Sequence, residues 1–348
     1  MSFLIMLTHV MMCLLKVLTF IYYYKIMRGH AMKSMRFDIL TIQDILEKHS
    51  LGRIDRIEYS DRGIVNPCVF INDHYVVRVN ARDVELPKFD NEQQALRMMK
   101  SEGIPVPDVY VFDNSHEHLP YEILITSKMP GIDIWKALET ATDESKIKMA
   151  YNSGVLLAKI HGIGRDEFGE LALSSNNQYD SWQQYLVEGM KQRTNRCLKL
   201  GILNPEEAER YVFVYKRATS LFSGISTASL VHNDYHFANM LCVDGEITAI
   251  LDMEWSIAGD PEFDFKSLHF KDVFTDASEM QQAFMAGYST LRKLSPLFDI
   301  KQLYYQLFET VELISVSYLH WGEESYQGFK ASAKSWLEQI EASWSTGY

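Results

Sequence analysis

Cysteine is scarce in this sequence, and the spacing of the cysteines suggests no shared role. None of the four belongs to a Cys-x-x-Cys pair, which argues against a zinc knuckle and against a disulfide framework. This usage is typical of a protein that works in a reducing compartment, so we expect a cytoplasmic location. The cysteines are Cys13, Cys68, Cys197 and Cys242.

Positive charge is also in short supply. The chain of 348 residues carries 34 Lys and Arg against 46 Asp and Glu, which gives a formal net charge of −12. We therefore do not expect a nucleic acid as a partner. The same balance mildly favours a cationic ligand, although an acidic surface mainly serves solubility.

Two glycine-rich phosphate-binding patterns are missing. Neither Gly-x-x-x-x-Gly-Lys nor Gly-x-Gly-x-x-Gly occurs in the sequence, so neither a P-loop nor a dinucleotide fingerprint is predicted. Internal repeats and low-complexity tracts are absent as well. With 47% hydrophobic and 23% charged residues, the composition is that of an ordinary globular protein with one large or two modest domains.

Residues 1–36 differ in composition from the rest of the chain. Lys16 is the only charged residue in the first 24, and an apolar stretch of roughly 20 residues is long enough to span a bilayer. In one interpretation residues 1–24 are a membrane anchor whose basic flank keeps the remainder in the cytoplasm. In the other, the natural chain begins at Met32 or Met35 and the preceding segment is a start-site artefact. Both stay open, so membrane contact is expected only if the anchor is real.

The most informative stretch runs from Leu230 to Phe265. Two short apolar runs, 240–243 and 247–251, flank the turn dipeptide Asp244-Gly245. Alternating apolar runs on either side of Asp-Gly are typical of a β-hairpin. We therefore predict a hairpin here, with polar residues gathered at its open end.

The residues at the two ends of this hairpin carry oxygen ligands. Asp234 and Asn239 precede it, and Asp252 ends its second run. Because a hairpin brings its two ends together, we expect these three side chains to converge. Carboxylate and amide oxygens suit Mg²⁺, and one carboxylate would remain to take a proton from a hydroxyl. That equipment is typical of phosphoryl transfer from a magnesium nucleotide.

The same stretch resembles the catalytic core of the aminoglycoside phosphotransferase and choline kinase-like family. The pattern His-x-Asp-(x)4-Asn matches residues 232–239, Ile-Leu-Asp matches 250–252, and Gly-Asp-Pro-x-x-Asp matches 259–264. The resemblance implies an α+β, bilobal protein-kinase-like fold with a small antiparallel-sheet N-lobe and a larger, mainly helical C-lobe. We place the nucleotide-binding N-lobe at residues 37–130 and the catalytic and substrate-binding C-lobe at 131–348.

The resemblance also implies roles for particular residues. Asp234 would orient or deprotonate the acceptor hydroxyl, while Asn239 and Asp252 would hold Mg²⁺ across the phosphates of ATP or GTP. His232, Asp260 and Asp264 would brace the catalytic loop.

In the N-lobe, the resemblance assigns three residues to the nucleotide. The strand Tyr75–Val79 would present Arg78 to the phosphates, where the family usually has lysine, and Glu92 would pair with it. Gly63 would lie in a loop that covers the phosphates, where glycine permits a close backbone approach.

The regular elements follow from periodicity and turn residues. Strands are predicted at 54–59, 68–71, 75–79, 109–111 and 121–126, and helices at 89–102, 149–161, 179–200, 205–222, 277–291, 300–318 and 331–344.

The predicted activity is transfer of the γ-phosphate of ATP or GTP to a hydroxyl of a small molecule, and the expected acceptor is an aminoglycoside-type antibiotic or another cationic metabolite. A nucleotide-binding pseudokinase and an atypical protein kinase are the alternatives, although neither Asp-Phe-Gly nor Ala-Pro-Glu follows the hairpin. A metal hydrolase built on His232, Asp234 and His236 is a third, but no second ligand cluster completes it.

Overall fold

The computed structural model describes residues 39–59, 68–81, 86–173, 175–266 and 278–344. Gly63 and the hydrophobic segment 1–36 lie outside these ranges, so both predictions stay predictions. Among the described helices, none has the length and apolar character needed to cross a membrane.

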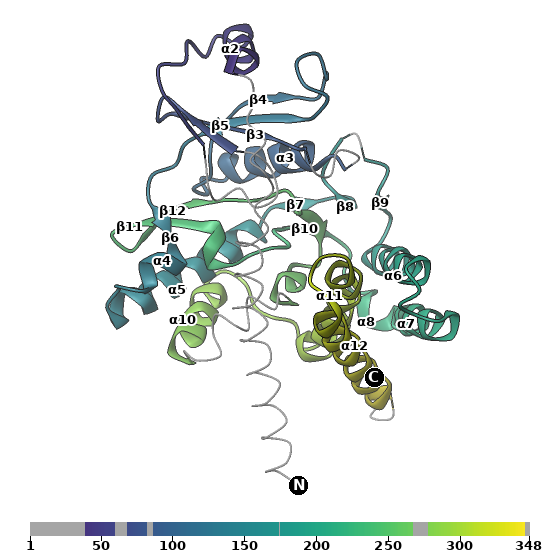
Figure 1. The fold of residues 1–348 in the computed structure, drawn as a ribbon. Helices are drawn as coiled ribbons and strands as arrows, with labels where there is room; N and C mark the ends of the chain where they lie inside the picture. Colours follow the sequence, from purple (N-terminus) through teal and green to yellow (C-terminus); the bar gives the residue numbers. More distant parts are fainter. Residues whose placement is uncertain (1–38, 60–67, 82–85, 174, 267–277, 345–348) are drawn as a thin grey trace.

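A five-stranded antiparallel sheet forms the N-lobe, at the top of Figure 1. Its buried aliphatic side chains pack with helix α2 (Ile39–Lys48) into a core of their own. In spatial order the strands are β1 (Ile57–Tyr59), β2 (Cys68–Ile71), β3 (Tyr75–Val79), β5 (Ile123–Ser127) and β4 (Val109–Asp113).

Helix α3 (Lys88–Ser101) lies between this sheet and the rest of the molecule (Figure 1). Its apolar residues Ala95, Leu96 and Met99 are buried in the large core of the C-lobe rather than in the core of the N-lobe sheet. The polar side chains near its start are buried too, since Asp90 and Glu92 are at most 5% exposed. The helix therefore belongs by sequence to the N-lobe and by packing to both lobes.

The C-lobe is mainly helical (Figure 1). Its chain reversals have ordinary local causes: a capping box joins Asn204 and Glu207 at the start of α7, and Gly322, with φ 88°, precedes α12. The helices are α4 (Ile134–Leu138), α5 (Asp143–Ile160), α6 (Trp182–Lys199), α7 (Pro205–Arg217), α8 (Thr219–Phe222), α10 (Ser278–Ser289), α11 (Phe298–His320) and α12 (Glu323–Ser343).

Two small antiparallel sheets complete the C-lobe. The first has the order β7 (Gly164–Arg165), β10 (Ala228–Val231), β13 (Ile257–Gly259), β8 (Phe168–Glu170) and β9 (Gln178–Tyr179). The second contains β12 (Glu246–Ile250), β11 (Met240–Val243) and β6 (Ile132–Asp133).

The hairpin β11–β12 has the geometry that its turn dipeptide predicts. Asp244 and Gly245 both have positive φ, 50° and 79°, as a type I′ turn requires. Strand β6 adds to the hairpin directly after Gly131, where a Cβ atom would lie 2.5 Å from the carbonyl oxygen of Cys242. Glycine is therefore needed at the point where the chain passes from one lobe to the other.

The predicted fold class is confirmed: the chain is an α+β protein with a sheet-rich lobe above a mainly helical one (Figure 1). The helix predicted at 205–222 is divided, since α7 ends at Arg217 and α8 begins at Thr219. The helix predicted at 331–344 begins earlier, at Glu323, directly after the left-handed Gly322.

Candidate active site

The predicted catalytic loop, residues 232–239, leaves the buried strand β10 and ends in the short helix η1 (Phe237–Asn239). Within it the amide Nδ2 of Asn239 donates to the Asp234 carboxylate oxygen Oδ2 and to the Asp234 carbonyl oxygen, both at 3.1 Å. The Nε2 atom of His236 lies 3.5 Å from the same carboxylate oxygen. The Asp234 carboxylate is thus oriented from two sides, while 32% of its side chain is exposed.

The side chain of Asp264 binds the backbone at the start of this loop. Its carboxylate accepts hydrogen bonds from the backbone N–H groups of His232 (2.9 Å) and Asn233 (2.6 Å), and from His161 Nε2 (2.9 Å). Burial alone would raise the pKa of Asp264, but the hydrogen bond and charge of His161 outweigh it and hold the pKa below its usual value. His161 is therefore a structural histidine that supports the loop from beneath.

His232 is neutral and structural. Its Nε2 atom lies 3.1 Å from the carbonyl oxygen of Leu251, to which it donates, and its Nδ1 atom accepts from the backbone N–H of Asp234. Burial lowers the pKa of His232, which agrees with a ring that carries one proton. Because Leu251 also donates its N–H to the carbonyl oxygen of Asn239 at 2.8 Å, Asp252 is fixed beside the catalytic loop.

Replacing Asp264 by asparagine should destabilise the protein by about 3–5 kcal/mol, because it removes one partner of a buried charged network. Since the folded pKa of Asp264 lies below its unfolded value, its stabilisation is present above about pH 4 and is lost as pH falls through the folded pKa. Urea unfolding between pH 3 and pH 7 measures both effects. Equal acid sensitivity in the two proteins would contradict this account.

Asp260 was predicted to brace the catalytic loop, but its side chain binds helix α11. Its carboxylate binds Lys301 Nζ at 2.6 Å and the Tyr305 hydroxyl at 2.5 Å, and both partners lie on α11. It therefore fastens α11 to the segment η2 (Pro261–Lys266).

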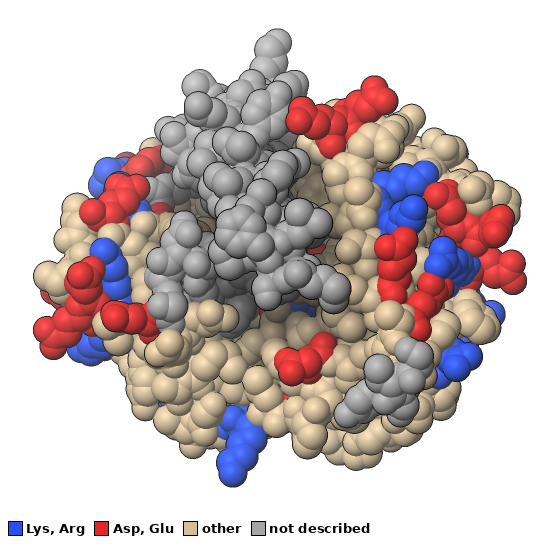
Figure 2. Space-filling view, turned by 90° about the horizontal axis from the view of Figure 1, so that it is seen from below, with Lys and Arg blue, Asp and Glu red and all other residues tan. Residues whose placement is uncertain are grey.

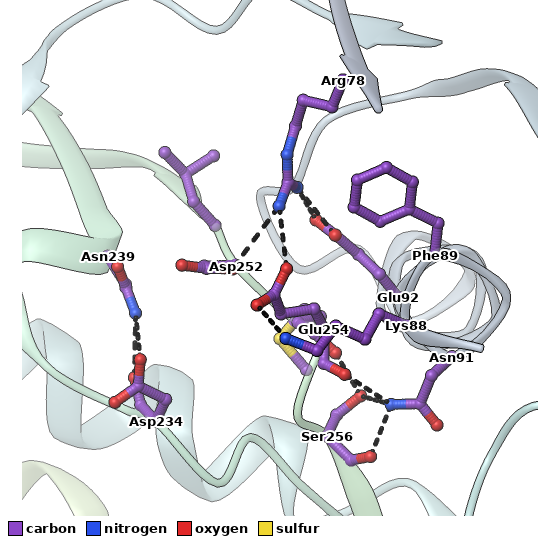
Figure 3. A network of polar contacts seen from close by, with 12 residues as sticks. Arg78, Lys88, Phe89, Asn91, Glu92, Asp234, Asn239, Asp252, Glu254 and Ser256 are labelled. Carbon is purple, nitrogen blue, oxygen red and sulfur yellow. Dashed lines mark hydrogen bonds and ion pairs between the residues drawn. The ribbon is translucent and has the colours of Figure 1, made fainter. Parts of the chain in front are cut away.

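The structure brings Arg78 and Glu92 into contact across the two N-lobe elements that carry them. Arg78 Nη1 lies 2.6 and 2.7 Å from the two oxygens of Glu92. Its Nη2 lies 3.3 Å from Glu254 and 3.7 Å from Asp252 (Figure 3). Burial raises the pKa of Glu92 to about 7, with Asp252 and Glu254 adding to the shift and Arg78 opposing it.

Two members of this cluster were not singled out in the sequence. Glu254 accepts from Lys88 Nζ at 3.2 Å, and the same ammonium lies 3.8 Å from the ring centre of Trp255. Both Lys88 and Glu254 are buried. The only sequence signal was the spacing Asp-Met-Glu, which places Glu254 two residues after Asp252.

Asn91 joins the helix that carries Glu92 to the segment that follows the hairpin. Its Nδ2 donates to the carbonyl oxygen of Ser256 at 2.6 Å, and its Oδ1 accepts from the N–H of Leu171 at 2.8 Å (Figure 3). Since Asn91 is 5% exposed, these bonds are shielded from water and fix α3 against the C-lobe.

The acidic side chains fit a hard cation. Ligand atoms of Glu92, Asp252 and Glu254 lie within 4.8 Å of one another, so three carboxylates share the space with the two cations Arg78 and Lys88. Glu92 and Glu254 are held by those cations, whereas Asp252 Oδ1 is buried and accepts no hydrogen bond. Burial, reinforced by Asp234, raises the pKa of Asp252.

Asn239 completes the oxygen set. Because its amide nitrogen is turned toward Asp234, its amide oxygen points the other way, and the Asp252 carboxylate lies between Asn239 and Arg78 (Figure 3). Carboxylate and amide oxygens are the ligands that Mg²⁺ prefers. The residues present therefore fit a magnesium ion beside Asp252.

Two acidic residues of helix α11 form ion pairs within the protein. Glu312 pairs with Arg193 at 3.2 Å and also binds Arg196, and Glu309 lies 3.7 Å from Lys266. On the face seen in Figure 2, acidic and basic side chains lie next to one another along both sides, and the described surface between them is mostly uncharged.

Both the sequence and the fold resemble those of known proteins. A sequence model of the family described as the phosphotransferase enzyme family matches residues 60–297. No curated protein sequence gives a match.

Solved structures resemble the chain over most of its length. A streptomycin–ATP–APH(2″)-IIa ternary complex is 19% identical, with a TM-score of 0.61 over 88% of this chain and 97% of that one. ADP-bound aminoglycoside phosphotransferase APH(2″)-Ib is 18% identical, with a TM-score of 0.58 over 87% and 97%. A thermostable mutant of aminoglycoside phosphotransferase APH(4)-Ia with AMP-PNP and hygromycin B is 16% identical, with a TM-score of 0.58 over 87% of this chain and 97% of that one. At these identities the likeness is one of fold.

Proposed function

The chain belongs to the phosphotransferase enzyme family, and from this premise we propose that it transfers the γ-phosphate of ATP or GTP to a hydroxyl of a small molecule. The observation that carries the proposal is the meeting of Asp234, Asn239 and Asp252 beside the hairpin β11–β12, with Arg78 above Asp252 (Figure 3). A base, oxygen ligands and a cation in one place match the needs of phosphoryl transfer.

In this proposal Asp234 binds the acceptor hydroxyl. The hydroxyl gives its proton to the Asp234 carboxylate while its oxygen bonds to the γ-phosphorus and the bond to the leaving nucleoside diphosphate breaks. The hydrogen bond from Asn239 holds the carboxylate in place for this step. When bound by Asp252 and Asn239, Mg²⁺ would neutralise phosphate charge.

Arg78 is proposed to bind the nucleotide phosphates, with Glu92 fixing its position. Arginine presents its N–H donors in a planar fork that matches the spacing of phosphate oxygens, whereas lysine offers a compact point charge. The guanidinium also stacks 4.9 Å from the ring centre of Phe89. Gly63 remains the candidate for the loop over the phosphates.

Replacing Arg78 by methionine should lower kcat/KM for the nucleotide roughly 10- to 100-fold, because charge-assisted hydrogen bonds to phosphate are lost. Arg78→Lys should recover only part of the activity, since a single ammonium cannot serve both Glu92 and a phosphate with the same geometry. Initial rates over a range of nucleotide concentrations measure both variants. Full activity in Arg78→Met would remove this residue from its proposed role.

We propose an aminoglycoside-type or other cationic acceptor, because the chain carries a formal net charge of −12 and the similar structures include aminoglycoside phosphotransferases. ATP and GTP are both candidate donors.

The test is consumption of ATP and GTP by the full-length protein with Mg²⁺, against a panel of aminoglycosides, macrolides, choline, homoserine and sugars. Acceptor-dependent turnover supports the proposal and names the acceptor class. Tight magnesium-nucleotide binding without turnover would favour a pseudokinase, and phosphate on an added protein would favour a protein kinase. Zinc-dependent phosphate release without nucleotide would favour a hydrolase.

A further inference from the structure

Asn233, the residue before Asp234, has a left-handed backbone with φ 69°. Asparagine adopts this conformation more readily than most residues, and glycine adopts it freely. A glycine would therefore satisfy the backbone conformation at this position, so the conformation does not explain why the residue has an asparagine side chain.

The side chain of Asn233 is held at both of its polar atoms. Its Nδ2 donates to the carbonyl oxygen of Trp255 at 2.8 Å, and its Oδ1 accepts from Lys266 Nζ at 2.6 Å. Its backbone N–H is bound by Asp264 at 2.6 Å. Three anchors, from two segments that follow the hairpin, thus hold the residue next to Asp234.

Lys266 is a charged group with little access to water, since 2% of its side chain is exposed. Besides Asn233, its ammonium lies 4.1 Å from the ring centre of Phe263 and 3.7 Å from Glu309 on α11. A buried ammonium is costly unless it is hydrogen-bonded. The bond to Asn233 is therefore strongly favoured, and it ties the catalytic loop to η2.

We propose that Asn233 and Lys266 form a pair that positions Asp234 for catalysis. Both are positioning residues, since neither is assigned a contact with substrate or nucleotide. The inference rests on the proposed function, because it takes Asp234 to be the group that receives the hydroxyl proton. The pair acts on the geometry of the proton transfer and leaves the nucleotide contacts of Arg78 and Asp252 in place.

The experiment is a double-mutant cycle with Asn233→Gly, Lys266→Met and the combined variant. Each single variant should lower kcat roughly 10- to 100-fold, since a misplacement of about 1 Å at a reacting group costs on that order, while KM for the nucleotide changes less than about twofold. The combined variant should lose no more than the larger single loss, because both changes break one interaction. Thermal unfolding of the same four proteins should show the same lack of additivity.

Lys301→Met is the matched control. Lys301 is also buried, with 5% of its side chain exposed, and it pairs with Asp260 at 2.6 Å and with Glu262 of η2 at 2.5 Å. The Lys301→Met substitution should lower thermal stability without lowering kcat. If Lys266→Met does not fold, Asn233→Gly carries the test, because glycine readily adopts the backbone conformation of residue 233.

The two measurements separate the possible failures. Non-additive unfolding with an unchanged kcat would overturn the positioning role and leave the pair as a structural contact. Multiplicative losses in kcat would overturn the coupling. If unfolding is non-additive but no acceptor supports turnover by the wild type, the proposed function fails together with the role in catalysis, whereas additive losses in an active enzyme leave the proposed function standing.

Discussion

Replacing Asp234 by asparagine should lower kcat by roughly 10²–10⁴-fold, the contribution expected of a general base. The amide cannot take a proton from the acceptor hydroxyl, although it can still accept the hydrogen bond that Asn239 now donates to Oδ2. KM for the nucleotide should change little, since Arg78 and Asp252 are untouched. Steady-state rates with the acceptor that the panel identifies measure the loss.

Asp244→Asn is the control for this substitution. It makes the same chemical change ten residues further along the chain, at the exposed turn between β11 and β12, and should keep wild-type activity. If Asp234→Asn stays within about threefold of the wild type, then Asp234 is not the base and the proton is taken by another group.

Replacing Asp252 by asparagine should abolish the part of nucleotide binding that depends on Mg²⁺. The substitution removes the negative charge of a side chain whose buried Oδ1 atom accepts no hydrogen bond in the protein, and a neutral amide oxygen is a weaker partner for a divalent cation. Calorimetric titration with ATP in the presence of Mg²⁺ and of EDTA measures the effect. We expect the wild-type affinity to fall to the variant's level when the metal is chelated.

Asparagine is preferred to alanine at this position for a physical reason. Asp252 has φ 64°, a left-handed conformation that asparagine adopts more readily than alanine does. Asp244, with φ 50°, again supplies the control, because Asp244→Asn makes the same change on a similar backbone. Equal Mg²⁺ dependence in Asp252→Asn and the wild type would remove Asp252 from the metal site.

The hairpin was predictable because its determinants are local. Asp244-Gly245 supplies two residues that accept positive φ, and the flanking apolar runs have the right length for paired strands. Once the hairpin is known, the approach of Asp252 to the catalytic loop follows from its position two residues after the end of β12. The matching patterns around it led to the correct family and fold class.

The partners of Arg78 were only half predictable. Glu92 lies 14 positions away, on the next element, and an acidic residue near the start of a helix was a reasonable choice. Glu254 lies 176 positions from Arg78, so only the packing of the two lobes brings them together. Sequence spacing carries no signal at that range.

The sequence by itself therefore determined the fold class, the hairpin and the family, because short patterns with fixed spacing encode them. The tertiary structure alone decided which charges are buried. The polar first turn of α3, which includes Lys88 and Asn91, looks like a solvated helix end but lies between the lobes. Lys266 likewise looks like a surface lysine, yet it lies beneath the catalytic loop beside Asn233. Burial depends on what packs over a residue, and distant segments of the chain supply that cover.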